Sequence, residues 1–436
     1  MLRTLSIISL AAAAAACATN RAETSAPYGP VAPAEAGFSA DGLAALDAHF
    51  AQQVADGVRA GYVIGVARNG RLVHTFATGM ADIDSGRAMD LDTRFRLASM
   101  TKPVTVAAVL SLVDAGTIDV DDSVSVYVPL MANMLVAEST TANAEGGFDA
   151  VPQDPPMTIR HLLTHTSGLG YALGAQSDLD QAYLANTLYD GDGDLQASIN
   201  QLTSLPLYSQ PGEQWFYSWA IDVLGRVVEV ASGIPFEDYL QEEIFDPLGM
   251  TATHFYSDPQ DAALLATVYG HDADGGFVAA QNVTFGSGDE TFPSGGGGLI
   301  STLPDYLRFA AMLANGGTLD GERILSPEAV AMMGSAQIPA SAFPRPSTFG
   351  GTFLGWGTEG RSFGYGVQVT TDADETPQVD FDGDFGWSGA YSTDFFASPE
   401  TGVAAVIMVQ SQGGPNRPPA DLPGDLRERV FGAMTE

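Results

Sequence analysis

The first part of the chain has two helical patterns separated by a strand pattern. Hydrophobic residues recur at helical spacing over residues 43–54, and Ser39, an N-cap residue type, precedes them, so a helix is predicted from this serine. The apolar runs 61–67 and 71–78 flank an Asn-Gly pair, a strong turn signal, and together they predict a β-hairpin. A second helix is predicted over residues 103–116, where a final glycine suits a helix stop.

The last part of the chain returns to the same two patterns. Residues 304–315 have helical spacing, and strand-like runs follow around 364–370, 390–397 and 402–409. Strands at both chain ends, with helices between them, predict an α/β fold of the α+β type. In this fold one antiparallel sheet is assembled from both chain ends and is flanked by helices.

The long middle of the chain mixes helical patterns with loops rich in Asp, Gly and Pro, and it contains no internal repeat. We therefore predict two domains. An α/β domain is formed by residues 39–116 together with 300–436, and a mostly helical domain, residues 117–299, is inserted between these two parts.

The N-terminus has the layout of a bacterial export signal. Residues 1–18 contain a basic residue, an apolar stretch too short to span a membrane, and an alanine run that ends at Cys17. Cys17, the only cysteine, resembles the lipid-modified cysteine of bacterial lipoproteins. Such signals usually carry Leu where this chain has Ala14, and cleavage after Ala18 would instead release a periplasmic protein. Residues 19–38, rich in Ala and Pro, are predicted to be a flexible linker.

Charge and composition limit the function. The 436 residues include 53 acidic and 18 basic side chains, a net charge of −35, which argues against nucleic acid as a partner because phosphate binding depends on clustered Lys and Arg. Hydrophobic residues make up 45% of the chain, which excludes a wholly disordered protein. Lys102 is the only lysine. A GC-biased genome explains the preference for Arg but not the one lysine that remains.

The residues around this lysine suit nucleophilic catalysis. Ser99 lies at the predicted start of a helix and Lys102 follows three residues later, so both side chains project from one face. A serine there is close to free backbone N–H groups that can hold an oxyanion. Lysine can accept the proton of the hydroxyl when its pKa is lowered, whereas arginine stays charged. Lys102 therefore occupies the position where arginine could not do the chemistry.

The pattern Ser-x-x-Lys resembles that of class A β-lactamases and penicillin-binding proteins. Other segments extend the resemblance over roughly residues 40–430. Tyr217, just before a predicted helix, resembles the second motif of class C β-lactamases, D,D-peptidases and related serine esterases, and LLTHTSGL at 162–169 fits the same superfamily. The chain is most similar to family VIII carboxylesterases, since Gly-Trp-Ser-Gly at 386–389 replaces the Lys-Thr-Gly of class C enzymes.

This resemblance implies acyl transfer in two steps without a metal or organic cofactor. Ser99 would attack an ester carbonyl while Lys102 and Tyr217 share the acceptance of its proton, and which of the two is the base stays open. The backbone N–H groups of Ser99 and Ala390 would hold the oxyanion. The substrate would be lined by Trp219, Trp387, Ser388 and Gly389.

Two departures from the family patterns bear on the substrate. Trp219 stands where β-lactamases have Asn, and Ser388 stands where the esterases usually have Gly. The first departure, together with the missing Lys-Thr-Gly, favours neutral esters over penicillins because the Lys meets the penicillin carboxylate. We therefore expect an exported bacterial carboxylesterase, in the periplasm or anchored to a membrane through Cys17, that acts on a small short-chain ester.

Two other functions remain as alternatives. One is a β-lactamase or D,D-peptidase acting on β-lactams or cell-wall peptides. The other is a non-catalytic relative that binds peptidoglycan or a partner, against which the intact Ser99, Lys102 and Tyr217 argue.

Some residues suggest a catalytic triad or a calcium site, but the full motif of each is missing from the sequence. His161 and His165 invite a Ser-His-Asp triad, but the chain lacks the Gly-x-Ser-x-Gly elbow, and the nearest string, around Ser388, ends in Ala. Two acidic clusters resemble calcium loops without completing the motif, and we expect solvated acidic loops there instead. They are Asp190, Asp192 and Asp194, and Asp380, Asp382 and Asp384. The glycine run 295–298 is expected to let two backbones pack closely near the site.

Overall fold

The structure is a computed structural model, and it describes residues 28–171, 177–186, 188, 194–255, 259–281, 283, 292–339, 341–342, 360–376, 378–412 and 422–435. The predicted export signal and Cys17 lie outside these residues. Within the described part, no helix is both long and apolar enough to cross a membrane.

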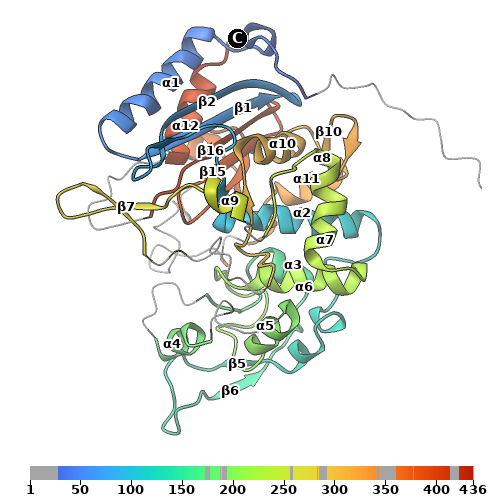
Figure 1. Cartoon of the computed structure of the whole chain (residues 1–436). Coiled ribbons are helices and arrows are strands. Elements are labelled where there is room, and N and C mark those ends of the chain that lie inside the picture. Colours follow the sequence, from blue (N-terminus) through green and yellow to red (C-terminus); the bar gives the residue numbers. More distant parts are fainter. Residues whose placement is uncertain are drawn as a thin grey trace, which may run out of the picture.

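An eight-stranded antiparallel sheet forms the upper half of the molecule in Figure 1. Its strand order is β12-β13-β14-β15-β16-β1-β2-β3, so the N-terminal hairpin joins the C-terminal strands through the pairing of β1 with β16, in which Val63 lies opposite Met408. The prediction of one sheet assembled from both chain ends is therefore confirmed. The strands are β1 (Gly61–Arg68), β2 (Arg71–Asp82), β3 (Arg87–Ala88), β12 (Arg361–Phe363), β13 (Gln368–Thr370), β14 (Phe385–Ser388), β15 (Asp394–Ser398) and β16 (Val403–Met408).

Helices cover both faces of this sheet. On one face, α1 (Ala40–Ala55), capped by the Ser39 hydroxyl as predicted, packs beside α12 (Leu422–Gly432). On the other face, α10 (Leu303–Ala314) lies against β1 and β16. Both β1 and β16 are buried along almost their whole length because each has a helix on either side.

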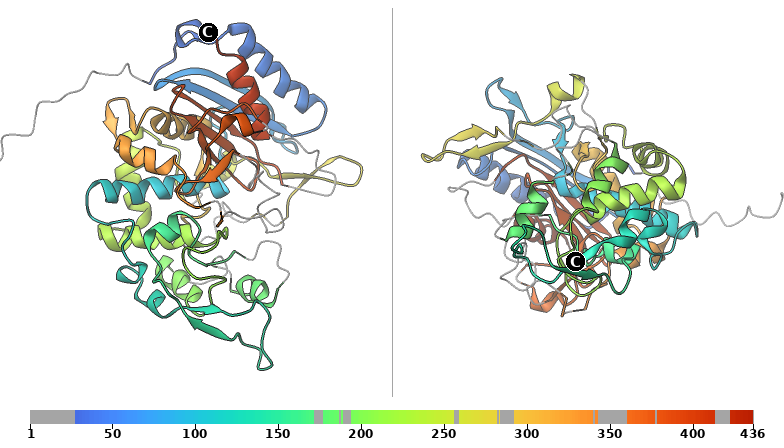
Figure 2. Two further views of the ribbon diagram at one scale, coloured as in Figure 1. Left: turned by 180° about the vertical axis from the view of Figure 1, so that it is seen from behind. Right: turned by 90° about the horizontal axis from the view of Figure 1, so that it is seen from below.

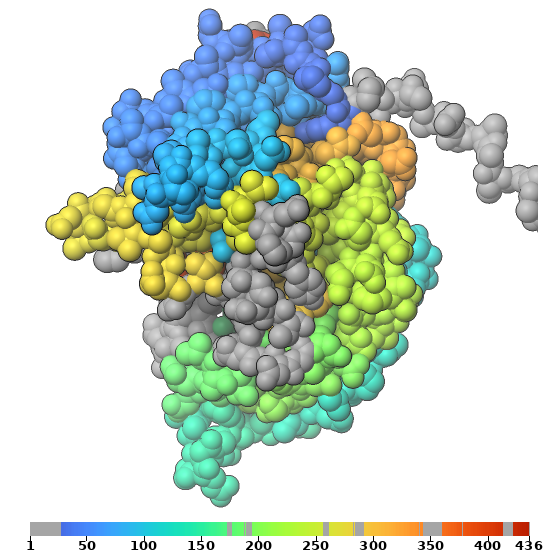
Figure 3. All heavy atoms as spheres, viewed as in Figure 1, coloured from blue at the N-terminus to red at the C-terminus, as the bar shows by residue number. Residues whose placement is uncertain are grey.

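Helix α2 (Thr101–Asp114) connects the sheet layer to the rest of the molecule. Eleven of its fourteen residues are buried, and it packs against α6 (Ala220–Ser232) from the middle of the chain. In the left view of Figure 2 the dark green segments lie below α2, whereas the sheet lies above it. In the space-filling view the blue N-terminal segment and the green middle segment accordingly occupy opposite ends of the molecule (Figure 3).

The remaining elements are short. The helices are α3 (Ile159–Leu163), α4 (Asp178–Leu184), α5 (Leu195–Leu202), α7 (Phe236–Leu240), α8 (Asp246–Leu248), α9 (Pro259–Leu264) and α11 (Pro327–Met333), and the π-helix η6 (Gln241–Phe245) joins α7 to α8. Single 3-10 turns are η1 (Pro33–Ala36), η2 (Ala98–Met100), η3 (Val124–Val126), η4 (Pro129–Asn133) and η7 (Ala373–Glu375). Two-stranded ribbons pair β4 (Phe95–Arg96) with β9 (Ile300–Ser301), β5 (Leu135–Ala137) with β6 (Ala150–Pro152), β7 (Tyr269–His271) with β8 (Phe277–Ala279), and β10 (Thr318–Leu319) with β11 (Glu322–Arg323).

The predicted flexible linker does not extend as far as residue 38. Val31 donates its backbone N–H to Leu72 on β2, η1 follows, and both Val31 and Phe38 are buried in the core beneath α1. The prediction is wrong for this part because two apolar side chains among the alanines and prolines are enough to attach the segment to the sheet.

Candidate active site

Ser99 and Lys102 lie where the chain leaves the sheet layer and enters α2. Ser99 is in the 3-10 turn η2, which runs directly into the helix, and its neighbour Ala98 has a left-handed backbone conformation (φ 46°). The Lys102 Nζ atom donates a hydrogen bond to the Ser99 Oγ atom at 3.3 Å. Ser99 is half-buried, whereas Lys102 has no exposed surface. The hydroxyl is thus partly exposed, and the amine is buried beneath it.

The Lys102 ammonium is surrounded by oxygen and by aromatic faces. The nitrogen donates to the carbonyl oxygen of Gly296 at 2.6 Å, and it lies 4.5 Å from the ring centre of Tyr217 and 5.4 Å from that of Tyr171. A carbonyl and two π faces compensate a buried cation for part of the water it has lost.

The glycine run passes beneath this lysine in close contact with α6. The Asp222 carboxylate accepts hydrogen bonds from the Ser294 hydroxyl at 2.6 Å and from the Gly296 N–H at 3.1 Å. The Thr105 hydroxyl donates to the Gly295 carbonyl at 2.8 Å. A Cβ atom on Gly296 would lie 2.2 Å from the Asp222 Oδ2 atom, so only glycine fits. A Cβ atom on Gly295 would lie 3.0 Å from the Ile221 carbonyl oxygen, so the expected close approach of a backbone near the site is confirmed.

Tyr217 lies over Lys102, as the sequence led us to expect, in the segment just before α6. Its ring is part of an aromatic cluster, with ring centres 4.9 Å from His165, 5.5 Å from Tyr171 and 5.9 Å from Trp387. This cluster orients the Tyr217 ring from several sides and narrows the space around the lysine.

His165 is a buried partner of the tyrosine segment. Its Nδ1 atom is 3.1 Å from the Ser218 hydroxyl, and its backbone carbonyl accepts the N–H of Phe216. Burial, with a smaller contribution from Lys102, holds the pKa of His165 well below its usual value, so the ring is neutral. His161 has a local role, since its ring accepts the N–H of Thr158 in a capping box at the start of α3. Both histidines therefore make local structural contacts, in line with the missing nucleophile elbow.

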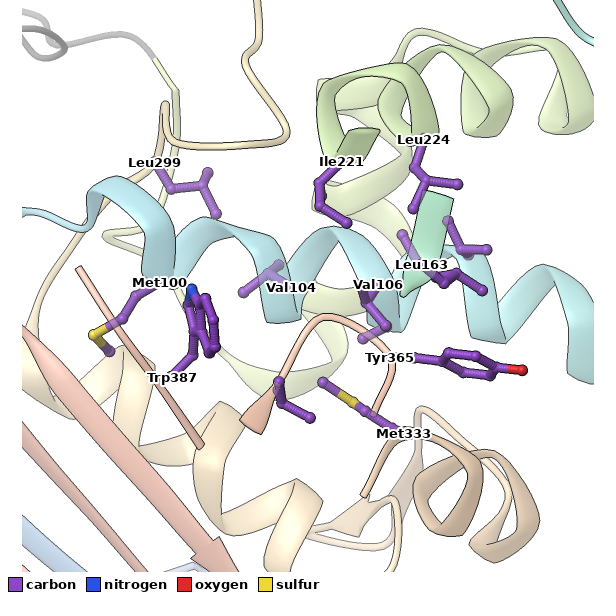
Figure 4. Packing of buried hydrophobic residues seen from close by; sticks show 14 of the residues in the cluster. Met100, Val104, Val106, Leu163, Ile221, Leu224, Leu299, Met333, Tyr365 and Trp387 are labelled. Atoms are coloured by element: carbon purple, nitrogen blue, oxygen red, sulfur yellow. The ribbon is translucent and has the colours of Figure 1, made fainter. Parts of the chain in front are cut away.

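The predicted substrate-lining residues lie on two sides of Tyr217. Trp219 stacks on Tyr171 with ring centres 4.2 Å apart, and Trp387 lies beside Met100 near the start of α2 (Figure 4). Both tryptophans are almost fully buried. The Ser388 hydroxyl donates to Asp394 at 2.5 Å, so this serine is engaged within the sheet.

Gly389 and Ala390 continue from β14 into the turn beside Ser99. The Gly389 N–H bonds to the Thr393 carbonyl, and a Cβ atom on Gly389 would lie 2.3 Å from the Leu97 carbonyl oxygen. This close approach brings the turn against the segment that carries Ser99. Ala390 itself is exposed.

The second acidic cluster is not a solvated loop, contrary to expectation. Asp380 is buried between Arg361 (2.6 Å) and Arg427 (2.8 Å), and Asp384 is only 1% exposed, whereas Asp382 is exposed. Sequence reasoning failed here because both arginines lie far from the cluster along the chain. In the first cluster, Asp194 caps α5, while Asp190 and Asp192 lie outside the described residues. Within the described part no group of His, Cys, Asp and Glu is arranged to hold a metal.

Two residues beside Lys102 were missed from the sequence, Tyr171 and Asp222. Asp222 left a signal, because it is an acidic residue in the otherwise apolar first turn of α6. Tyr171 left none, since its contact with Lys102 depends on how the chain returns after α3.

The chain is similar to several known proteins. The family model "Beta-lactamase" matches residues 46–427. An uncharacterised protein of Mycobacterium tuberculosis is 36% identical over 362 residues, covering 81% of this chain and 86% of that protein. Esterase EstB of Burkholderia gladioli is 34% identical over 403 residues, covering 87% and 93%. Among solved structures, EstCE1, described as a hydrolase with promiscuous acyltransferase activity, matches with a TM-score of 0.72 at 28% identity, covering 90% of this chain and 99% of that one.

Proposed function

The chain belongs to the beta-lactamase family, and from this premise we propose that it is a serine esterase that cleaves short-chain carboxylic esters through an acyl-enzyme on Ser99. The observation that carries the proposal is the contact between the Ser99 hydroxyl and the Lys102 amine beneath Tyr217. A half-exposed hydroxyl with a buried amine at 3.3 Å is the arrangement that an activated nucleophile requires.

The reaction proceeds in two steps. The Ser99 oxygen attacks the ester carbonyl carbon, its proton passes to the Lys102–Tyr217 pair, and the same proton then moves to the departing alcohol as the ester C–O bond breaks. Water next attacks the acyl-enzyme, delivers one proton to the pair and releases the acid, and the proton returns to Ser99. The N–H groups of Ser99 and Ala390 hold the oxyanion in each step, and loss of one such donor costs about 10²–10³ in rate.

Neutral esters are favoured over β-lactams by two features of the chain. No lysine exists beyond Lys102, so none is available on β14 to meet a substrate carboxylate. Trp219, in place of Asn, stacks on Tyr171 and provides no side-chain amide. The esterase names of relatives such as EstB support the same choice.

Turnover of p-nitrophenyl butyrate, compared with that of a chromogenic cephalosporin, tests the proposal. We expect rapid release of nitrophenolate and at most weak cephalosporin hydrolysis. Preferential cephalosporin hydrolysis would instead identify a β-lactamase or D,D-peptidase. A fluorophosphonate probe should label the wild-type protein on Ser99 and leave Ser99→Ala unlabelled. Absence of labelling in both would favour a non-catalytic binding protein.

We further propose that this esterase acts outside the cytoplasm. The proposal rests on the export-signal layout of residues 1–18 and on Cys17, which lie outside the described residues. Membrane attachment would then come from a lipid on Cys17.

A further inference from the structure

Lys102 is a buried amine with no carboxylate in direct contact, and it becomes a buried cation when it takes up a proton from Ser99. Its nitrogen is held by the Ser99 hydroxyl, by the Gly296 carbonyl and by two aromatic faces, and within the described residues it forms no ion pair. Lysine is almost never fully buried without a compensating charge. A group that supplies a negative charge is therefore expected close to Lys102.

Asp222 is connected to Lys102 through a single residue. The N–H of Gly296 donates to the Asp222 Oδ1 atom at 3.1 Å, and the carbonyl of the same Gly296 accepts from Lys102 Nζ at 2.6 Å. The Ser294 hydroxyl donates to the same Oδ1 atom at 2.6 Å. One buried carboxylate oxygen therefore fixes both ends of the segment that presents a carbonyl to the lysine.

The second carboxylate oxygen of Asp222 also supports a role for this residue at the site. Asp222 has no exposed surface, and its Oδ2 atom makes no hydrogen bond, although it faces the Gly296 backbone closely enough to exclude any side chain there. Burying a carboxylate oxygen without a hydrogen bond costs free energy, and an apolar residue at this position of α6 would avoid that cost. A carboxylate is also favoured in this first turn of α6 by the helix dipole.

Other titratable groups around Lys102 do not supply the charge. His165 is neutral, because burial keeps its pKa low and Lys102 lowers it further. Tyr217 and Tyr171 present their ring faces to the ammonium. Burial raises the pKa of Asp222, and the charge of Lys102 and the hydrogen bonds from Ser294 and Gly296 partly offset that rise.

We propose that Asp222 is a positioning residue of the acyl-transfer site, which holds the Ser294–Gly296 segment against Lys102 and supplies the negative charge that stabilises the Lys102 ammonium. This rests on the proposed function in assigning Lys102 to the reaction, but the electrostatic pairing itself is independent of any substrate. Within the described residues Asp222 makes no hydrogen bond to Ser99, and it acts through Gly296 and Lys102.

The pairing is tested by titrating Lys102 directly. Because the chain has one lysine, protein made with ¹³Cε-labelled lysine gives a single side-chain signal whose shift follows its protonation. In Asp222→Asn the midpoint of that titration should fall by about 1 pH unit or more, since an opposite charge that favoured the ammonium is gone. The matched control is Asp305→Asn, a second buried aspartate whose nearby charges are Arg94 and Arg308. An Asp222→Asn midpoint that moves no more than that of the control would overturn the proposal.

Positioning is tested by kinetics on the same variants. Asp222→Asn should lower kcat for p-nitrophenyl butyrate by about tenfold or more with little change in KM. A displaced Gly296 carbonyl misplaces the lysine and not the substrate, and the ammonium that forms when Lys102 takes the Ser99 proton loses the charge that stabilises it. Ser294→Ala keeps the charge and removes one hydrogen bond, so it should leave the Lys102 midpoint at its wild-type value. A Ser294→Ala midpoint that falls as far as that of Asp222→Asn would overturn the electrostatic role. If the wild type hydrolyses no ester, the NMR titration still decides the pairing, so failure of the function and failure of this inference remain distinguishable.

Discussion

Replacing Asp384 by asparagine should stabilise the protein at neutral pH and leave it unchanged in acid. Asp384 precedes β14, the strand that carries Trp387, and its side chain is 1% exposed. Burial raises the pKa of this carboxyl from 3.8 to about 6. At neutral pH the native protein therefore holds a carboxylate in a place that disfavours it, although Arg427 lies near enough to recover part of the cost.

The size and sign of the effect follow from linkage. The difference between 3.8 and about 6 corresponds to about 3 kcal/mol, at 1.36 kcal/mol per pKa unit. The native state binds the proton more tightly than the unfolded state, so this contribution to stability is complete below about pH 4. It is lost as the pH rises through about 6. Asparagine cannot ionise, and the variant should gain up to about 3 kcal/mol over wild type at pH 7 and above.

Guanidinium unfolding of both proteins at several pH values between about 4 and 8 measures the difference. Asp382→Asn, two residues away and exposed, is the matched control, and it should show little pH-dependent difference from wild type. A stability difference between Asp384→Asn and wild type that stays constant from pH 4 to pH 8 would refute the reasoning. The result would then reflect altered hydrogen bonding and not a buried charge.

Three further outcomes are expected. Ser99→Ala and Lys102→Arg should each lower kcat for p-nitrophenyl butyrate by about 10³-fold or more, measured by nitrophenolate release, and near wild-type turnover in either would refute the assigned site. Ser388→Ala should lower kcat/KM by no more than about tenfold, because that hydroxyl is bonded to Asp394; complete loss in this variant with an active Ser99→Ala would make Ser388 the nucleophile. Cys17→Ala should move the protein from the membrane fraction to the soluble fraction on cell fractionation, and unchanged membrane association would exclude lipidation.

The sheet and its covering helices were predictable because their hydrophobic patterns have one regular period. The β1–β2 hairpin and α1 were expected from strand and helical spacing, and the structure has them with nearly the expected bounds. The attachment of residues 31–38 to the sheet was not predicted, since it depends on two isolated apolar side chains. The buried position of Asp380 was also missed, because its partner arginines come from other parts of the fold.

The site could be predicted in proportion to how local its contacts are. Ser99 and Lys102 are three residues apart at a helix start, and the sequence alone placed them together. The approach of Tyr217 was expected only through a resemblance to a family, since 115 positions separate it from the lysine. The contact between Gly296 and Lys102 could not be predicted, because nothing in a glycine run specifies which side chain its carbonyl will contact.

The geometry of the site provides a second explanation for lysine, and not arginine, at position 102. Its side chain ends in one compact nitrogen that reaches a hydroxyl and a carbonyl at once, between two aromatic faces and without exposed surface. A guanidinium is planar, larger and carries five donors in a fixed fork, so in the same space it would leave several donors unsatisfied. Arginine at position 102 is thus excluded by shape as well as by its inability to give up a proton. A methionine at 102 would remove the charge and the donors while keeping much of the length, so comparing Lys102→Met with Lys102→Arg separates the two reasons. If shape matters, the methionine variant should be the more stable of the two, although neither should hydrolyse the ester.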